Sequence, residues 1–373
     1  MERRIEEITS ILKSPDEKDK NLILKAAYFA EKAHEGQKRN SGEPYFNHLF
    51  ETAKNLAEMK MDSVSIAAGF LHDTLEDTSV TKEELEKEFG KEITFIVEGV
   101  TKLGNLRYHG ADRHNESLRK LLLATSKDMR VVMVKLCDRL HNIKTLEFVP
   151  EEKQNRIAKE TLEIYAPLAY RLGIRKLSRQ LEDIAFSYAD KKGYKEISEL
   201  MKESYEEKLS NLEKFRKSVT KELAKSGSTQ FHSDYRVKGV YSLYKKYLKY
   251  KKDFEKIHDM LAMRIIVPKT EDCYKVLGII HSAWRPLPGK IKDFISFPKQ
   301  NGYQSLHTTV FTGDGDIVEI QIRTEEMHKI AEYGVASHAI YKSELGNAAQ
   351  KKEVVSWIKN ISSGEAGDIK TGC

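Results

Sequence analysis

The stretch LAMRIIV at residues 261–267 is apolar except for one arginine, and it ends in three β-branched residues. Such a run predicts a buried strand. Two similar runs follow at residues 305–311 (SLHTTVF) and 317–322 (IVEIQI), and stretches with helical spacing lie at 273–284 and 325–341. Strands that alternate with helices indicate an α/β or α+β domain in this part of the chain.

The chain before this region has a different pattern. From residue 21 to about 190, apolar residues recur at spacings of three and four, as in Leu49, Ala53 and Leu56, and strand signals are nearly absent. Prolines and glycines divide the region into about eight helices of ordinary length. We therefore predict an all-α domain here. The expected bounds are 1–190 for the all-helical domain, 191–226 for a charged helical connector, 227–345 for the α/β domain, and 346–373 for a C-terminal helix and frayed tail.

Composition and charge narrow the class of protein. The 373 residues fit two domains, and 63 Lys and Arg against 57 Asp and Glu leave a net charge of +6, too small to indicate a nucleic-acid binder. The cysteines Cys137, Cys273 and Cys373 form neither a CxxC pair nor a zinc pattern, which favours a reducing compartment. The start, MERRIEEITS, lacks the apolar core of a signal peptide, and nowhere do about 20 apolar residues follow one another. We expect a soluble cytoplasmic protein with no membrane partner.

Residues of metal-ligand type stand on separate predicted helices of the first domain: His48, the pair His72 and Asp73, and Asp138. Imidazole and carboxylate together suit Mn, Fe or Zn, and such a set leaves positions open for water and a phosphate oxygen. Glu76 and Asp77 follow the pair by one helical turn, where they could orient or deprotonate water. The alternative is that His72 is a hydrogen-bonded core histidine.

The second domain carries a basic segment and two interior carboxylates. Residues 235–246 (YRVKGVYSLYKK) have the spacing of a strand that runs into a helix, and such a junction can hold a polyphosphate. A solvated basic helix is the alternative. Asp259 precedes LAMRIIV and Glu319 lies within IVEIQIR, so carboxylates on neighbouring strands could bind magnesium. Tyr303, beside a glycine, is a candidate platform for base stacking or a half-buried strand tyrosine.

The motifs SGEPYFNH, GFLHDTLEDT, VKLCDRLHN and ETLEIYAPLAYRLG resemble the HD hydrolase domain of the RelA/SpoT family of alarmone synthetase/hydrolases, over most of residues 25–190. The resemblance implies that one Mn²⁺ ion binds His48, His72, Asp73 and Asp138. It further implies that Glu76 and Asp77 assist water attack, and that Arg39, Ser41 and Asn142 contact the nucleotide. Ser117 stands where an asparagine is expected near this nucleotide pocket.

The later segments resemble the nucleotidyltransferase-like synthetase domain of the same family, an α/β domain with a mixed sheet, over about residues 230–345. The string NGYQSLHTTV is the most diagnostic, and KIKD at 290–293 resembles the basic signature of bifunctional members. Ala339 departs from a usual tryptophan outside the expected site. The resemblance implies that Arg236, Lys238, Ser242 and Lys246 hold ATP; that Lys292, Lys299, Asn301, Tyr303 and His307 hold GDP or GTP; and that Asp259 and Glu319 carry Mg²⁺, with Glu319 also the base for the 3′-hydroxyl.

Taken together, the resemblance implies a bifunctional enzyme of the stringent response. It would transfer pyrophosphate from ATP to the 3′-OH of GDP or GTP, giving ppGpp or pppGpp and AMP, and would hydrolyse these products. Long family members continue into regulatory domains that sense the ribosome; we expect a catalytic fragment or a short form, for which a link to the ribosome is doubtful. The alternatives are a general HD nucleotide phosphohydrolase with a nucleotide-binding second domain, and an RNA-binding adaptor that uses the basic residues 235–256.

Overall fold

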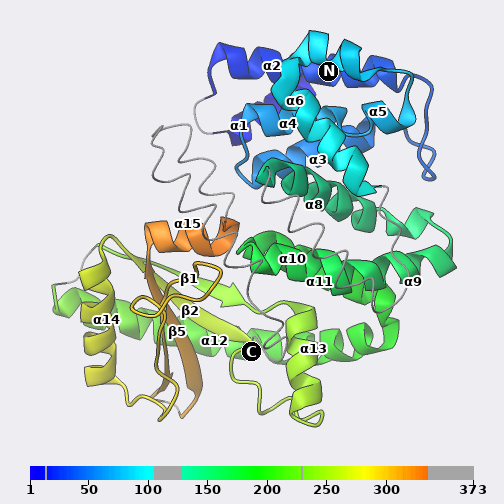
Figure 1. Ribbon diagram of the computed structural model, residues 1–373. Coiled ribbons are helices and arrows are strands. Elements are labelled where there is room, and N and C mark those ends of the chain that lie inside the picture. The colour runs from blue at the N-terminus through cyan, green and yellow to red at the C-terminus, as the bar shows by residue number, and fades with distance from the viewer. Residues whose placement is uncertain (13–14, 105–127, 228–229, 314, 335–373) are drawn as a thin grey trace. The chain divides into compact units, whose positions relative to one another are not determined.

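The computed structural model describes residues 1–12, 15–104, 128–227, 230–313 and 315–334 (Figure 1). Its described residues form two compact units, Met1–Ala189 and Asp190–Gly334. The expected C-terminal helix and tail at 346–373 and the two departures at Ser117 and Ala339 lie outside the described residues. No helix in the described ranges is long and apolar enough to span a membrane.

The first unit is helical throughout its described part, as predicted. Its α-helices are α1 (Glu2–Ile11), α2 (Glu17–Ala33), α3 (Phe46–Glu58), α4 (Ser63–Leu71), α5 (Thr74–Asp77), α6 (Lys82–Gly104), α8 (Met129–Lys144), α9 (Glu151–Glu160), α10 (Ala166–Arg171) and α11 (Arg175–Ala189). Two short elements complete the set: η1, a 3-10 turn at Leu146–Phe148, and η2, a π-helical segment at Thr161–Tyr165.

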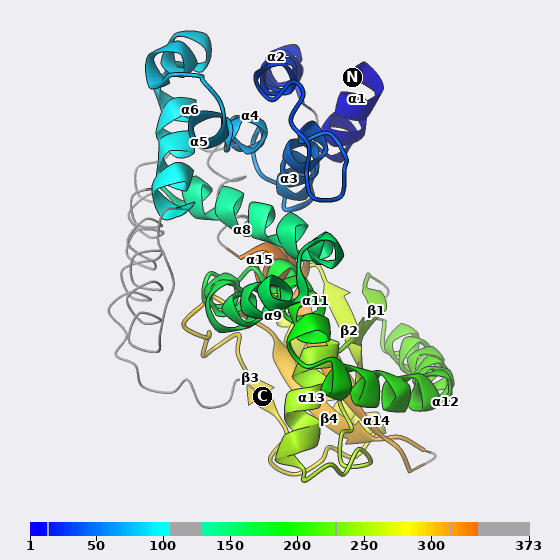
Figure 2. The ribbon, with the colours of Figure 1, turned by 90° about the vertical axis from the view of Figure 1, so that its right-hand side faces the viewer.

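Helix α4 is the centre of this unit. Its sequence SVSIAAGFL is apolar on all sides, so the helix is buried from Ser65 to Leu71 and packs against α2, α3, α6 and α8. Gly69 permits the close contact with α3, because a Cβ atom there would lie 2.5 Å from Leu56 Cδ1 and 3.3 Å from Ala53 Cα. Helix α8 in turn contacts α3 and α6 (Figure 2). The ends and faces of α3, α4 and α8 therefore meet around one buried region.

The second unit is built on a five-stranded mixed sheet, which confirms the predicted fold class. The strands are β1 (His232–Val237), β2 (Leu261–Val267), β3 (Lys292–Asp293), β4 (Leu306–Phe311) and β5 (Ile317–Thr324), and the helices are α12 (Lys191–Lys225), α13 (Val240–Lys249), α14 (Thr270–Ala283) and α15 (Glu325–Tyr333). The order is β1-β2-β5-β4-β3, with β2 and β5 parallel and the other pairs antiparallel.

The two faces of this sheet differ in chemistry, because side chains alternate along each strand. One face carries Met263, Ile265, Ile320 and Ile322, all fully buried. Helices α12 and α14 lie on this apolar face, where Arg216 of α12 bonds to Tyr235 and His281 of α14 bonds to Thr308.

The opposite face carries a row of polar side chains that crosses all five strands. Paired residues on neighbouring strands place one row of side chains on it: Asp234, Arg264, Gln321, His307 and Lys292. Arg236 and Glu319 belong to the adjacent row.

The segment expected to connect two domains is α12, which packs against other elements of the second unit. It buries Leu212, Phe215, Val219 and Leu223 and packs against β2, α13 and α14. Its charged residues alternate with this apolar stripe, as in an ordinary amphipathic helix. The domain bounds inferred from the sequence stay a proposal.

Candidate functional site

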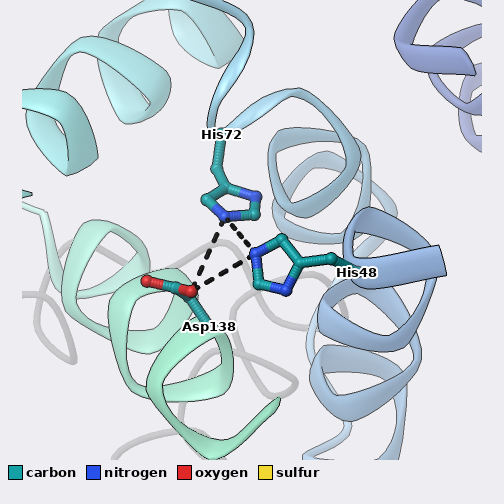
Figure 3. Close-up of side chains that lie close together, drawn as sticks. All are labelled: His48, His72 and Asp138. Carbon is teal, nitrogen blue, oxygen red and sulfur yellow. Dashed lines mark hydrogen bonds and ion pairs between the residues drawn. The ribbon is translucent and has the colours of Figure 1, made fainter. Parts of the chain in front are cut away.

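Four side chains of metal-ligand type meet in the first unit, and Figure 3 shows three of them, His48, His72 and Asp138. His48 lies in the first turn of α3, His72 directly follows α4, and Asp138 lies within α8. His48 Nε2 is 3.3 Å from His72 Nε2 and 3.4 Å from Asp138 Oδ1, and the ligand atoms of the three groups all lie within 4.8 Å of one another. Asp73 Oδ2 is 3.1 Å from His72 Nε2 and 3.5 Å from His48 Nε2. This cluster could hold a metal ion.

The charges of the cluster fit a cation. Burial raises the pKa of Asp138, but Lys135 and the two histidines outweigh burial and hold that pKa well below its usual range. Burial likewise raises the pKa of Asp73, but His72 and His48 hold that pKa well below its usual range, so this carboxylate is ionised. Burial lowers the pKa of His72, yet Asp73 and Asp138 raise it to about 9. Two ionised carboxylates, the buried Asp138 and the half-buried Asp73, therefore favour positive charge at the point where the ligand atoms meet, and a nitrogen and oxygen donor set suits Mn, Fe or Zn.

Each histidine of the cluster uses its second ring nitrogen for a hydrogen bond. His72 Nδ1 lies 2.8 Å from the carbonyl oxygen of Gly69, and His48 Nδ1 lies 2.8 Å from Nδ1 of the buried His141. Burial, His48 and Arg39 lower the pKa of His141 to about 3, so this imidazole is neutral. The sequence analysis missed His141, although its position three residues after Asp138 in α8 is a helical-spacing signal.

Tyr45 connects the cluster to Asp77, which lies at the exposed edge of the cluster. Its hydroxyl lies 2.8 Å from Asp73 Oδ2 and 2.9 Å from Asp77 Oδ2, and it can donate to either oxygen. Asp77 and Glu76 belong to the four-residue helix α5, directly after the ligand pair. Burial and the charge of Asp73 raise the pKa of Glu76, which favours proton uptake by this carboxylate. Tyr45 was also missed, because nothing in its local spacing indicates the contact.

An open cavity of about 310 Å³ borders the cluster. Its lining includes Arg39, Ser41, His48, His141 and Thr145. Arg39 Nη2 donates to Asn142 Oδ1 over 2.7 Å, and the Asn142 amide donates to Asp138. The residues implied to contact a nucleotide thus form a chain of hydrogen bonds from the cavity to the cluster, with Ser41 on the cavity wall.

In the second unit, two lysines surround Asp259, which precedes β2. Lys238 Nζ lies 2.7 Å and Lys246 Nζ 2.5 Å from Asp259 Oδ2. Burial lowers the pKa of Lys238 to about 8, against the opposing effect of Asp259. Helix α13 begins two residues after Lys238, and Ser242 lies in its first turn. Lys252, further along the chain, pairs instead with the half-buried Glu196 on α12.

Glu319 lies on the polar face of the sheet with its own partners. Gln321 Nε2 donates to Glu319 Oε1 over 2.8 Å, and His307 Nδ1 lies 3.3 Å from the same oxygen. Burial raises the pKa of Glu319, but His307 and Gln321 lower it to about 2, so the carboxylate is ionised at neutral pH. Ala262 of β2 pairs with Glu319, so Asp259 and Glu319 lie toward the same end of two parallel strands. Two ionised carboxylates at one sheet end fit Mg²⁺.

The residues implied to hold guanine nucleotide lie at the β3–β4 side of the sheet. Lys292 pairs with His307, and Lys299 Nζ lies 5.6 Å from the ring centre of Tyr303. Tyr303 is only 6% exposed, and its hydroxyl lies 2.7 Å from His307 Nε2. The Asn301 side chain accepts from the backbone N–H of Tyr303. In this structure the Tyr303 ring packs edge-on against Phe294 rather than presenting an open stacking surface.

Buried arginines occupy the other end of the polar face. Arg264 and Arg323 are 8% and 2% exposed, and both reach Glu332 and His328 of α15. The run LAMRIIV contains Arg264, whose charge the strand prediction passed over. Its pairing with Gln321 shows that it shares the face of Glu319.

A helical unit with a histidine–aspartate cluster beside a cavity, followed by a mixed sheet with ionised carboxylates among lysines, defines the class: an HD-type metal domain joined to a synthetase-type domain. Comparison with known families agrees. The HD domain profile matches residues 26–175, and the profile of the region found in RelA / SpoT proteins matches residues 235–345. The chain belongs to the RelA/SpoT family and is of the Rel/SpoT type, with both domains.

Curated relatives bear names for both activities. The chain is 44% identical over 347 residues to a GTP pyrophosphokinase of Myxococcus xanthus, an alignment that covers 92% of this chain and 46% of the relative. It is 47% identical over 344 residues to a guanosine-3′,5′-bis(diphosphate) 3′-pyrophosphohydrolase of Aquifex aeolicus, covering 91% and 48%. A Borreliella burgdorferi protein with the same hydrolase name is 43% identical over 348 residues, covering 92% and 52%. The chain spans about half the length of the curated relatives it matches.

Proposed function

We propose that this chain makes and degrades guanosine alarmones in the stringent response. It transfers pyrophosphate from ATP to the 3′-OH of GDP or GTP, which gives ppGpp or pppGpp and AMP, and it hydrolyses these products to GDP or GTP and pyrophosphate. The observation that carries the proposal is that one chain combines the His48, His72, Asp73 and Asp138 cluster with the ionised carboxylates Asp259 and Glu319. Because the substrates are cytoplasmic nucleotides, we also propose a cytoplasmic location.

For hydrolysis, the cluster would hold Mn²⁺. The ion, when bound, would supply Lewis-acid activation of water and of a phosphate oxygen. Arg39 and Ser41 on the cavity wall and Asn142 beside it would hold the nucleotide. Glu76 and Asp77, at the exposed edge of the cluster, would orient the water and accept its proton.

For synthesis, the protein contributes position and charge more than covalent chemistry. Arg236, Lys238, Ser242 and Lys246 would bind the phosphates of ATP, and Lys238 and Lys246 are already held together by Asp259. Asp259 and Glu319 would carry Mg²⁺, which neutralises phosphate charge. Glu319, ionised and fixed by Gln321 and His307, would accept the proton of the 3′-hydroxyl.

On the guanine side, Lys292, Lys299 and Asn301 would contact the nucleotide. Tyr303 and His307, which are hydrogen-bonded to each other, would shape the pocket. Tyr303 would need to leave its buried position to stack on the base, so its role in the unliganded structure is to hold His307.

Two assays test the proposal. ATP labelled in its β and γ phosphates is incubated with GDP and Mg²⁺, and ppGpp labelled at the 3′ position is incubated with Mn²⁺. We expect both reactions, with His72→Ala losing only hydrolysis and Glu319→Gln losing only synthesis. Hydrolysis without any transfer to GDP would support the rival in which the second unit merely binds nucleotide.

A further inference from the structure

His141 contacts the ring nitrogen of His48 that faces away from the cluster. It lies on α8, the helix that also carries Asp138, and its ring centre is 4.9 Å from that of His48 on α3, with the rings tilted by 44°. The two Nδ1 atoms are 2.8 Å apart, and His141 is only 9% exposed. One helix therefore supplies a ligand of the proposed cation and also contacts the outer nitrogen of a second ligand.

The position of each proton follows from the hydrogen bonds. The Gly69 carbonyl can only accept, so His72 keeps a proton on Nδ1, and Nε2, which faces the cluster, is the nitrogen that would bind a cation in place of its own proton. His48 also directs Nε2 at the cluster, 3.4 Å from Asp138 and 3.5 Å from Asp73. If His48 Nε2 binds a cation, its proton must be on Nδ1, and that proton points at His141 Nδ1. His141 must then accept through Nδ1 and carry its own proton on Nε2.

We propose that His141 is a positioning residue, whose Nδ1 accepts the Nδ1 proton of His48 and thereby fixes the tautomer and ring orientation that offer His48 Nε2 to a divalent cation. This inference rests on the proposed metal site. Hydrogen bonds to the outer nitrogen of metal-binding histidines hold the ring and increase its basicity. His72 has a backbone carbonyl for this purpose, whereas His48 depends on a side chain and is therefore open to test by substitution.

A purely space-filling role is the alternative, and a matched pair of substitutions separates the two. His141→Asn keeps an acceptor oxygen near the place of Nδ1, while His141→Leu has almost the same shape as asparagine and no acceptor. The dissociation constant for Mn²⁺ alone is measured by electron paramagnetic resonance of the free ion. We expect His141→Leu to bind Mn²⁺ about 10- to 100-fold more weakly than the unchanged protein, and His141→Asn to recover most of that loss.

Equal Mn²⁺ affinity of the two variants would overturn the proposal, whether both affinities are unchanged or both are weakened, because the acceptor would then be irrelevant. The melting temperature of each variant without metal reports its folding, and if His141→Leu does not melt cooperatively, His141→Ala replaces it in the same comparison. His72→Ala distinguishes a failure of the metal site itself, because a His72→Ala protein that binds Mn²⁺ normally refutes the site and not only the role of His141.

Discussion

Substitution of Gly69 by alanine tests whether the contact of α4 with α3 holds the ligand helices in place. The new Cβ would lie 2.5 Å from Leu56 Cδ1, in a region where Leu56 and Ala53 are fully buried. Overpacking of this kind costs about 1–3 kcal/mol, and replacing a helical glycine by alanine returns about 1 kcal/mol. The difference is a net loss of up to about 2 kcal/mol in the free energy of unfolding of the first unit.

The measurement is urea unfolding followed by circular dichroism, with Gly278→Ala as the matched control. Gly278 lies in α14, and a Cβ there meets no heavy atom within 4 Å. That variant should be about 0.5–1 kcal/mol more stable than the unchanged protein, because only the backbone effect remains.

A double variant identifies the contact responsible. In a Leu56→Ala background the side chain that Gly69→Ala would strike is absent, so the cost of Gly69→Ala should fall by more than half. Since Gly69 also accepts the His72 hydrogen bond, Gly69→Ala should weaken Mn²⁺ binding in parallel. A Gly69→Ala protein as stable as Gly278→Ala would refute the packing argument.

Three further predictions concern the two proposed activities. His72→Ala or Asp138→Ala should abolish Mn²⁺-dependent hydrolysis of ppGpp and leave synthesis intact; full hydrolysis with unchanged metal content would contradict the ligand assignment. Because the pKa of Lys238 is about 8, its ammonium charge is lost as pH rises through that value, so kcat/KM for ATP should fall between pH 7 and 9, and Lys238→Arg should remove this fall. Tyr303→Ala should raise KM for GDP several-fold more than KM for ATP, and equal losses would indicate a general folding defect.

The change from a helical to a mixed fold could be predicted from the sequence, because spacing alone separates the two parts. LAMRIIV and IVEIQI do form neighbouring strands, and the mixed sheet is confirmed. The two-residue strand β3 could not be found in this way, since it exists only through its pairing with β4. The assignment of α12 to the second unit depends in the same way on contacts distant in sequence.

For the candidate site, too, some residues could be predicted from the sequence and others depend on contacts distant in sequence. His48, His72, Asp73 and Asp138 could be selected by residue type and motif, because metal chemistry restricts the choice. Tyr45 could not, and the helical spacing of His141 from Asp138 does not by itself reveal a role, because both residues act through contacts of 2.8 Å with residues distant in sequence. Arg264 was not selected as a site residue, because one charge in an apolar run does not change the strand prediction.

The two faces of the sheet in the second unit differ in what an amino-acid substitution would affect. A substitution on the face under α12 and α14 acts on folding, because Met263 and Ile320 are buried there against helices. The row of Arg236 and Glu319, on the other side of the same strands, belongs to the proposed nucleotide site, so we expect a substitution there to change ligand binding. Because strand alternation keeps the two sets apart, substitutions in the polar row could change ligand preference while the apolar core stays unchanged.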